Sequence, residues 1–431
     1  MRIIHNKSVD FQTVFHNIVE KSFHGVRSDI TDHVCEIITD IKECGDTKLL
    51  AAIEKYDGPG ISVENLVVRD EEIESAWDFV GEREKAALQF AAGNIAKFHK
   101  RQLEKSWFSC EDEGVLLGQI IRPLKRVGIY APGGNAPYPS TVLMNTIPAR
   151  VAGVQEVYVA TPAKKGNINP YVLVAAHIAG ADKIFKMGGA HAIAAFAYGT
   201  ASVPKVDKIV GPGNIYVSEA KRQVYGIVGV DMIAGPSEIV IVADDSAPPR
   251  CIAMDLISQA EHDELTSSLL ITDSQRLAEE VEKIIKEELF SSGEITLRAL
   301  ENNCWLIIVE TLEDAFSFVN QIAPEHVELV VRTPFPIVEK IENAGSIFIG
   351  TYSPVPIGDY VAGPNHTLPT GGTARFSSPL GVYDFIKRSN MISYSSQALA
   401  SHGSYASIIA GIEGFNNHKK AILERDCIVQ K

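Results

Sequence analysis

The chain has 431 residues, more than one ordinary domain contains, and this length predicts two or three domains. Its residues are 45% hydrophobic and 22% charged, as in globular proteins with a substantial core. Lys and Arg number 40 against 54 Asp and Glu, and the formal net charge of −14 argues against a nucleic-acid-binding surface. No apolar stretch reaches the roughly 18 residues of a membrane span and residues 1–10 show no secretory pattern, so we expect a cytoplasmic protein without a membrane partner.

The first 125 residues are expected to form a helical N-terminal section. Charge-rich stretches with helical spacing cover residues 33–56 and 71–108, and the glycines and proline of residues 58–60 end the first of them. The second stretch carries an apolar stripe made of Ala86, Ala87, Phe90, Ala91, Ile95 and Phe98. The section carries no obvious chemistry, and we expect it to support the rest of the chain.

Residues 126–235 alternate short β-rich runs with helical segments. The predicted strands are 127–131, 156–161, 183–187 and 208–210, and the predicted helices are 140–152, 170–179, 190–198 and 215–224. Apolar strands that alternate with helices are typical of a parallel sheet covered on both faces. We therefore predict a first Rossmann-like α/β unit here.

The same alternation begins again over residues 236–378. Strands are predicted at 238–243, 268–272, 305–309, 327–331 and 346–349, and helices at 248–261, 274–290, 311–321 and 336–343. Two consecutive α/β units of similar size predict a duplicated Rossmann-like fold of two parallel sheets. Residues 379–431 follow as a polar helical tail, of a kind that often docks on a partner subunit.

Two glycine-rich turns follow predicted strands of the first unit. They read Tyr130-Ala-Pro-Gly-Gly-Asn-Ala-Pro137 and Gly211-Pro-Gly-Asn214. Such turns let backbone N–H groups approach an anion at a helix N-terminus, and they lie at strand carboxyl ends, where α/β folds bind ligands. Neither has the GxGxxG spacing of a dinucleotide fingerprint, so a plain strand-to-helix turn is an equal alternative.

Gln259 and His262 share one face of a predicted helix and offer an oxygen and an imidazole nitrogen. Together they could hold one side of a Zn²⁺ or Mn²⁺ ion, and the alternative is a hydrogen-bonding helix end. Asp359, in the glycine-rich loop 358–372, and His418, in the tail, would complete a mixed set suited to zinc with open positions. Nothing local in the sequence brings these residues together.

Glu325 and His326 are adjacent groups capable of proton transfer near neutral pH, between a predicted helix and a strand. At a strand entrance their side chains point in different directions, so they could serve two separate proton transfers. Ordinary surface polarity is the alternative.

The six cysteines lack CxxC spacing, which excludes a zinc ribbon or a thioredoxin-type motif. Each is expected to behave as a small buried hydrophobe. A catalytic thiol at Cys251 or Cys304 is an alternative that no neighbouring residue favours.

These stretches together resemble the histidinol dehydrogenase family, over nearly the whole length from residue 127 and more loosely before it. The shared motifs are Tyr-Ala-Pro-Gly-Gly from 130, Val-Asp-Lys-Ile-Val-Gly-Pro-Gly-Asn at 206–214, Ala-Gly-Pro-Ser-Glu at 234–238, Ser-Gln-Ala-Glu-His at 258–262, Ala-Pro-Glu-His at 323–326, Gly-Asp-Tyr at 358–360 and Pro-Asn-His-Thr-Leu-Pro-Thr at 364–370. The resemblance implies oxidation of L-histidinol to L-histidine through L-histidinal, with two NAD⁺ and water. It also implies an intertwined homodimer with one zinc per active site.

The resemblance implies a set of site residues. Zinc would be held by Gln259, His262, Asp359 and His418. The substrate would contact Ser237, Gln259, His262, His326, Asp359, Glu413 and His418, of which Glu413 and His418 come from the partner's tail. NAD would contact Tyr130, His191 and Asn214.

The implied mechanism gives each catalytic residue one role. His326 would act as the base for the hydroxyl proton, Glu325 would activate the water that hydrates the aldehyde, and zinc would orient the substrate. One departure concerns His191, because the family usually has Gln at that position, and we expect altered NAD affinity. His366 lies in a family motif, with a loop-fixing hydrogen bond and a substrate contact as equal alternatives.

Two other functions are weighed against this one. A related NAD-dependent dehydrogenase could oxidise another polar primary alcohol to its acid, although Glu413 and His418 match the histidinol enzymes. A catalytically inactive metal- or nucleotide-binding protein could keep the same scaffold, although Glu325 and His326 are intact.

Overall fold

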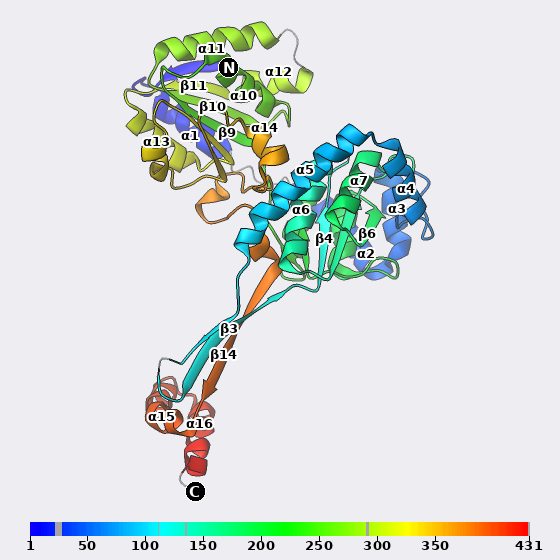
Figure 1. Ribbon diagram of the computed structural model, residues 1–431, viewed down its shortest axis with the longest axis vertical. Coiled ribbons are helices and arrows are strands. Elements are labelled where there is room, and N and C mark those ends of the chain that lie inside the picture. The colour runs from blue at the N-terminus through cyan, green and yellow to red at the C-terminus, as the bar shows by residue number, and fades with distance from the viewer. Residues whose placement is uncertain (22–27, 111, 134–135, 290–292, 430–431) are drawn as a thin grey trace. The chain divides into compact units, whose positions relative to one another are not determined.

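The computed structural model describes residues 1–21, 28–110, 112–133, 136–289 and 293–429. Contacts divide the chain into two compact units (Figure 1). Unit 1 consists of Met1–Gln102 and Leu124–Phe385, and unit 2 consists of Leu103–Pro123 and Ile386–Lys431. Each unit is assembled from separated segments, which a linear reading does not reveal. The division into four consecutive sections, with boundaries at 125, 235 and 378, stays a prediction from the sequence.

The first α/β half of unit 1 contains a parallel sheet of five strands. In chain order these are β4 (Arg126–Tyr130), β5 (Glu156–Thr161), β6 (Lys183–Lys186), β7 (Lys208–Val210) and β8 (Gly229–Val230). Their order in the sheet is β6-β5-β4-β7-β8. The intervening helices are α6 (Pro139–Ala152), α7 (Pro170–Ala179), α8 (Gly189–Tyr198) and α9 (Ile215–Val224). All four strands and four helices predicted here are confirmed to within a residue.

The second α/β half repeats this topology. Its sheet is built from β9 (Glu238–Ala243), β10 (Ser267–Thr272), β11 (Cys304–Ile308), β12 (His326–Val330) and β13 (Ser346–Ile349), in the order β11-β10-β9-β12-β13. The main helices are α10 (Pro249–Ala260), α11 (Gln275–Glu288), α12 (Glu294–Asn303) and α13 (Leu312–Ile322). Numbered along the chain, the five strands of each half run 3-2-1-4-5, which is the Rossmann order and confirms the predicted duplication.

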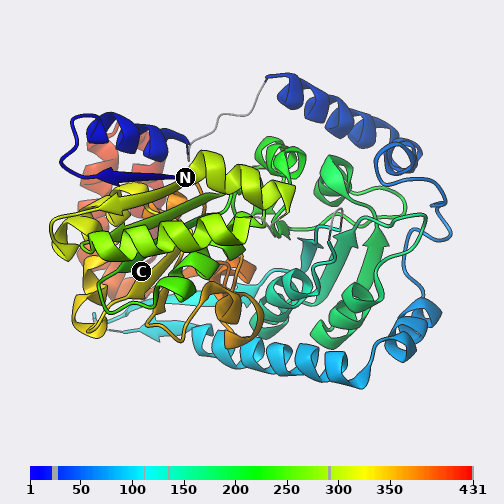
Figure 2. The same ribbon diagram turned by 90° about the horizontal axis from the view of Figure 1, so that it is seen from above.

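The N-terminal residues complete both halves. β1 (Arg2–His5) pairs in parallel with β11 at the edge of the second sheet (Figure 2), and α1 (Phe11–Lys21) contributes Phe11 and Phe15 to that half's core. α2 (Ser28–Cys44) and α3 (Asp46–Tyr56) pack instead on the first half, where their apolar side chains join Phe185 and Phe196. The section thus supports the remainder of the chain, as expected, but it includes strands as well as helices.

α4 (Asp70–Phe79) and α5 (Glu82–His99) follow, and the apolar stripe predicted on α5 is only partly correct. Ala91 and Ile95 are buried, whereas Phe90 and Phe98 are 62% and 37% exposed. The buried face runs through Lys85 and His99 instead, because the Lys85 ammonium lies over the Trp77 ring and pairs with Glu82. Apolar spacing alone did not reveal which face the helix buries.

Unit 2 contains an antiparallel arm and two helices. β3 (Val115–Pro123) pairs with β14 (Ile386–Tyr394) along nine residues, and β2 (Trp107–Ser109) adds a short third strand. α15 (Ser396–Ile412) and α16 (Asn416–Val429) follow the arm. The tail is therefore helical from Ser396, but the residues before it form a strand that the sequence did not predict.

Two smaller expectations have clear outcomes. Among the described residues, no helix is long and apolar enough to cross a membrane. The expectation that the cysteines are buried is wrong for Cys35, Cys44, Cys110 and Cys251, which are exposed, whereas Cys304 is buried as expected. Burial raises the pKa of the Cys304 thiol to about 12, which leaves it an unreactive core residue.

Candidate active site

The turn after β7 lies against the end of β4, at the point where the strand order of the first sheet reverses. Gly211 has a φ of +112°, and a Cβ atom there would stand 2.1 Å from the carbonyl oxygen of Tyr130. Only glycine fits both the conformation and the space. The glycine predicted from the motif is therefore required by the close approach of two backbone segments.

A buried ion pair fixes the same turn. The Lys221 ammonium and the Asp231 carboxylate pair with side chains that are 2% and 1% exposed. Asp231 Oδ2 accepts the Gly211 N–H at 2.8 Å, and Lys221 Nζ donates to the Gly211 carbonyl oxygen at 3.0 Å. Both polar groups of Gly211 are thus held by charged partners, so the turn is formed before any ligand arrives.

The three residues expected to contact NAD lie at the carboxyl edge of the first sheet. Tyr130 ends β4, and its buried hydroxyl accepts the Gly189 N–H at 3.1 Å. Burial raises the pKa of Tyr130 to about 12, which keeps the hydroxyl protonated. Asn214 is exposed and begins α9, where its Oδ1 accepts the N–H groups of Tyr216 and Val217. Gly134 and Asn135 of the first glycine-rich motif lie outside the described residues.

His191 differs from the other two because its ring is buried. The side chain is 1% exposed, and its Nε2 lies 2.9 Å from Asp57 Oδ2. Asp57 follows α3 in the N-terminal section, for which the sequence suggested no chemistry. The residue that holds His191 was missed because nothing in the local sequence connects positions 57 and 191.

The predicted catalytic pair lies at the amino edge of the second sheet, where β12 begins beside β9. His326 Nδ1 donates a hydrogen bond to the Glu238 carbonyl oxygen at 3.1 Å, and Glu325 Oε2 accepts the Glu238 N–H at 3.1 Å. Glu325 and His326 are both buried, so the alternative of surface polarity is wrong. They bind the N–H and the carbonyl oxygen of one residue at the start of β9, so the backbone of Glu238 positions both side chains.

The hydrogen bond of Nδ1 determines what the other nitrogen of His326 can do. Because Nδ1 carries the proton, Nε2 presents a lone pair, and no described residue gives this buried atom a hydrogen bond. Burial is the main cause that lowers the pKa of His326 to about 3, so the ring is neutral near pH 7. A neutral imidazole with an unpartnered Nε2 has the form required of a general base.

Two carboxylates lie close to this imidazole. Asp359, in the π-helical turn η4 (Gly358–Ala362), places Oδ1 3.9 Å from His326 Nε2, and burial raises its pKa to about 7. Burial also raises the pKa of Glu325 well above its ordinary value, although hydrogen bonds from the Glu238 N–H and the Ser237 hydroxyl oppose this shift. Ser237, an expected substrate contact, therefore touches the catalytic pair.

His366 fixes the loop that carries Asp359. Its Nδ1 donates to the Asp359 carbonyl oxygen at 3.0 Å, and its Nε2 lies 3.3 Å from the Thr141 hydroxyl near the start of α6. Of the two roles considered for this residue, the structure thus contains the loop-fixing hydrogen bond. The same bonds connect the α6 helix of the first half to the Asp359 turn.

The proposed zinc ligands occupy two units. Gln259 is buried in the last turn of α10, His262 is exposed just beyond it, and Asp359 lies on η4, whereas His418 belongs to unit 2. Among the described residues, no three His, Cys, Asp or Glu side chains gather as a metal site. Of the four expected ligands, unit 1 contains only two residues of these types, His262 and Asp359. The expected ligands in unit 1 therefore cannot form a group of three such side chains.

The ligands in unit 1 nevertheless fit a cation. The Gln259 amide is buried with no described hydrogen-bond partner for Nε2, and turning the amide over would put its oxygen there. Asp359 is a desolvated carboxylate, and the carboxyl-terminal end of α10 carries partial negative charge. An amide oxygen, an imidazole nitrogen and a carboxylate together suit zinc.

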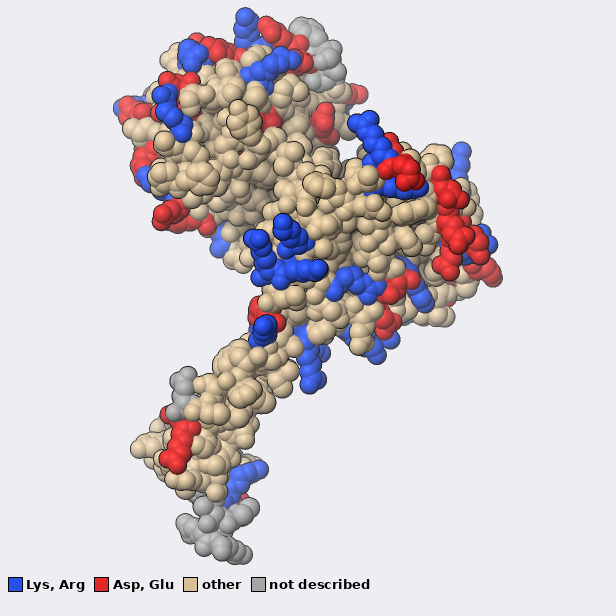
Figure 3. Space-filling model, viewed as in Figure 1, with Lys and Arg blue, Asp and Glu red and all other residues tan. Residues whose placement is uncertain are grey.

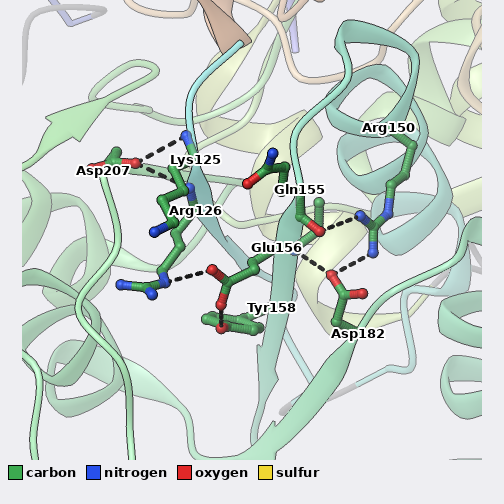
Figure 4. Close-up of polar contacts among 9 residues, drawn as sticks. Lys125, Arg126, Arg150, Gln155, Glu156, Tyr158, Asp182 and Asp207 are labelled. Atoms are coloured by element: carbon green, nitrogen blue, oxygen red, sulfur yellow. Dashed lines mark hydrogen bonds and ion pairs between the residues drawn. The ribbon is translucent and has the colours of Figure 1, made fainter.

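The amino edge of the first sheet offers a direct comparison (Figure 4). Asp207, just before β7, accepts the backbone N–H groups of Lys125 and Arg126 at 3.1 and 3.0 Å. Arg126 in turn pairs with Glu156 at 2.9 Å. The side chains of Asp207, Arg126 and Glu156 are thus paired with backbone groups or with one another.

The comparison with known proteins decides the family. A family model described as histidinol dehydrogenase matches residues 22–426. The chain belongs to the histidinol dehydrogenase family. Enzymes of this family are oxidoreductases that act on a CH–OH group, and the chain is an enzyme of this class.

Individual histidinol dehydrogenases match over almost their full length. That of Geobacter metallireducens is 48% identical over 430 residues, 99% of this chain and 98% of its own. That of Bacillus cereus is 48% identical over 407 residues, 94% of each chain. The crystal structure of histidinol dehydrogenase from Elizabethkingia anophelis matches with a TM-score of 0.94 at 34% identity, covering 100% of this chain and 99% of that one.

Proposed function

We propose that the protein oxidises L-histidinol to L-histidine through L-histidinal, with reduction of two NAD⁺, as an enzyme of histidine biosynthesis in the cytoplasm. The relatives that match almost the whole chain are named histidinol dehydrogenase, which supports this reaction. The observation that carries the proposal is the buried His326, whose Nδ1–H is fixed on the Glu238 carbonyl while Nε2 has no described partner.

His326 Nε2 accepts the hydroxyl proton of the substrate as hydride leaves the same carbon for NAD⁺. Glu325 adjoins the base, held by the Glu238 N–H and Ser237, and takes a proton from the water that adds to the aldehyde. His326, protonated in the first oxidation, gives that proton to the carbonyl oxygen as the water adds. It is again a neutral base when a second hydride leaves the hydrated carbon for the second NAD⁺ and a hydroxyl proton passes to Nε2. Two bases with separate orientations thus serve an oxidation and a hydration in one site.

Zinc would be held by Gln259, His262, Asp359 and His418, and when bound it orients the amine and imidazole of the substrate. The chain's own residues shape the rest of the substrate site. The proposed contacts are Ser237, Gln259, His262, His326, Asp359, Glu413 and His418.

NAD would lie at the carboxyl edge of the first sheet, against the turns that carry Tyr130, His191 and Asn214. The start of α9 is the positive end of a helix dipole, which suits the pyrophosphate. The side chain of His191 is buried, so its part in binding is to support the turn before α8.

The homodimer is proposed from the apolar surface of unit 2. On α15 the exposed side chains are spaced at helical intervals, namely Tyr405, Ile408, Ile409 and Ile412, with Phe415 after the helix. Figure 3 shows few charged side chains on the visible face of this unit. Glu413 and His418 lie at the same end and are exposed. A second copy that covers this surface would receive both residues in its active site, which supports a shared site.

The first experiment measures NADH formed from L-histidinol and NAD⁺ with and without a chelator. Two NADH per histidinol, lost on chelation and restored by Zn²⁺, are the expected result. No NADH from histidinol in the zinc-loaded protein would contradict the proposal. If another polar primary alcohol then gave NADH, the related-dehydrogenase alternative would replace it.

Mixing two inactive variants tests the shared site separately. His326→Asn removes the base from unit 1, and His418→Asn removes a proposed ligand from the tail. In a dimer with shared sites, half of the subunit pairs are hybrids with one intact site, so mixing restores about a quarter of the wild-type activity. A mixture as inactive as its components would contradict the exchange of tails.

A further inference from the structure

Asp57 lies at the end of α3 with its side chain 8% exposed, and it reaches the turn that connects β6 to α8. Its Oδ2 accepts the Gly188 N–H at 2.7 Å and lies 2.9 Å from His191 Nε2. One carboxylate oxygen therefore holds both the first residue of the turn and a side chain in the first turn of the helix.

The turn is tightly confined around this carboxylate. A Cβ atom on Gly188 would lie 2.9 Å from Asp57 Oδ1 and 2.7 Å from Pro162, and Gly189 has a φ of +57°. The Gly189 N–H is bound by the Tyr130 hydroxyl at 3.1 Å. Two consecutive glycine amides are thus committed to Asp57 and Tyr130, and neither remains free for a phosphate.

The position of Asp57 resembles that of a bound anion. The carboxylate stands at the N-terminus of α8, where the helix dipole and the free N–H groups favour negative charge. Because the chain supplies its own anion there, the nucleotide's pyrophosphate has to bind at another helix start.

The carboxylate also determines the state of His191. An ionised carboxylate only accepts hydrogen bonds, so Nε2 of the ring carries a proton toward Asp57. The ring stacks on Tyr56, with centroids 5.9 Å apart and planes 21° apart, and the Tyr56 hydroxyl lies 2.8 Å from His33 Nε2. Tyr56 is partly exposed, so this series of contacts runs from the glycine turn to the surface.

We propose that Asp57 is a positioning residue for the nucleotide: it fixes the Gly188–Gly189 turn, the tautomer of His191 and the orientation of the Tyr56 ring before NAD binds. The inference rests on the proposed function, since it concerns the same nucleotide site. It places part of the NAD affinity in the N-terminal section, through a carboxylate that touches no substrate.

The variant Asp57→Asn tests this role, with Asp46→Asn as the matched control. Asp46 begins the same helix and also bonds to the first half, through the Ser202 N–H and hydroxyl, but it touches no glycine turn. We expect Asp57→Asn to raise the Kd for NAD by about tenfold or more, as loss of a charge-assisted hydrogen bond does, while the KM for histidinol changes far less. Asp46→Asn should leave the Kd for NAD within about twofold of the wild-type value.

Several outcomes would overturn the inference. They are an unchanged Kd in Asp57→Asn, or the same rise in both variants, which would indicate a general loss of stability. If Asp57→Asn fails to fold, ¹⁵N spectra of the wild-type histidines decide instead, because the proposal requires a proton on Nε2 of His191. If wild-type protein binds no NAD at all, the proposed function fails; if it binds NAD normally and Asp57→Asn does too, only this inference fails.

Discussion

In the first α/β half the turns proposed to bind NAD follow the strands, whereas in the second half the reactive side chains precede them. Both halves have the same strand order, so the difference lies in which edge of the sheet is used. At the carboxyl edge helices begin, and their N–H groups and positive dipole ends suit phosphates. At the amino edge helices end, and α10 turns its negative end toward Gln259 and His262. One topology would thus supply an edge suited to the proposed nucleotide and an edge suited to the proposed zinc.

A carboxylate at the amino edge of each sheet makes the same kind of hydrogen bond to the neighbouring strand. Asp207, just before β7, accepts N–H groups at the start of β4, and Glu325, just before β12, accepts the N–H at the start of β9. β7 and β12 occupy the same place in the strand order. The two carboxylates therefore make the same connection between neighbouring strands. In the first half the Asp207 carboxylate contacts the backbone N–H groups of Lys125 and Arg126, while Glu325 has a neutral imidazole beside it.

The largest effect is expected for Glu325→Gln, which tests whether Glu325 acts as a base in addition to connecting the two strands. In Glu325→Gln the amide oxygen can still accept the Glu238 N–H, but the group can no longer take a proton from water. We expect kcat to fall by about 10²–10⁴, the usual contribution of a general base. Steady-state NADH production measures it.

Asp207→Asn is the matched control for that variant. It weakens the equivalent connection in the first half, so the free energy of unfolding should fall by about 1–2 kcal/mol while kcat stays within about twofold. Equal losses of kcat in the two variants would show that Glu325 acts only through the strand connection.

The next effect concerns how the first half holds its turn. Lys221→Met leaves the buried Asp231 carboxylate without its cation, and we expect the free energy of unfolding to fall by about 3–5 kcal/mol. Urea unfolding measures the change. Lys208→Met is the control, because its pair with Asp384 is partly exposed and should contribute about 1 kcal/mol or less. A loss for Lys221→Met no larger than that of the control would contradict the importance of burial.

A smaller effect is expected at the glycine of the same turn. Gly211→Ala introduces a methyl group against the Tyr130 carbonyl at a positive φ, which should cost about 2–3 kcal/mol and weaken NAD binding. Gly226→Ala has a similar φ of +93° but nothing within 4 Å, and backbone strain alone should cost about 1 kcal/mol. Thermal unfolding of both variants separates the cost of backbone strain from the cost of the steric clash with the Tyr130 carbonyl. Equal losses of stability in the two variants would mean that this clash is unimportant.

The last expected effect is a dependence of stability on pH, with opposite sign in the two halves. Burial raises the pKa of Glu328, in the middle of β12, from 4.5 to about 8, and the neighbouring Asp255 carboxyl adds to the shift. The folded protein then keeps a proton that the unfolded chain releases above pH 4.5. The free energy of unfolding contributed by this group therefore falls as pH rises from about 4.5 to about 8. Glu328→Gln should flatten the profile in that window.

Glu219, in the first half, provides the contrast. Burial opposes ionisation, but hydrogen bonds from Arg222 and Gln223 lower the pKa of this carboxyl. Its stabilising contribution is therefore present above pH 4.5 and is lost as pH falls through the lowered pKa. Urea titrations of Glu219→Gln should flatten the acid side alone. A flattened alkaline side would contradict the assignment of the two glutamates.

The sequence predicted much of the fold because parallel α/β units have strong local patterns. Apolar runs such as residues 156–161 and helices that begin with Pro170 signal their own boundaries. The pairing of β3 with β14 has no such signal, because Gln119 and Asn390 are 271 positions apart and β14 reads as polar. A strand whose only support is a distant partner cannot be recognised from its own residues.

The sequence alone determined which residue types could react, where the glycine turns lie and in which order they follow along the chain. These features depend on neighbouring residues and on family motifs, which a short stretch of sequence contains. Which carboxylates lose their solvent, which histidine nitrogen holds a proton and which edge of each sheet carries the chemistry were decided only by tertiary structure. Asp57 and Asp231 look like ordinary surface residues until folding buries them against Gly188 and Gly211. Burial strengthens such contacts by removing water, and the sequence does not encode burial residue by residue.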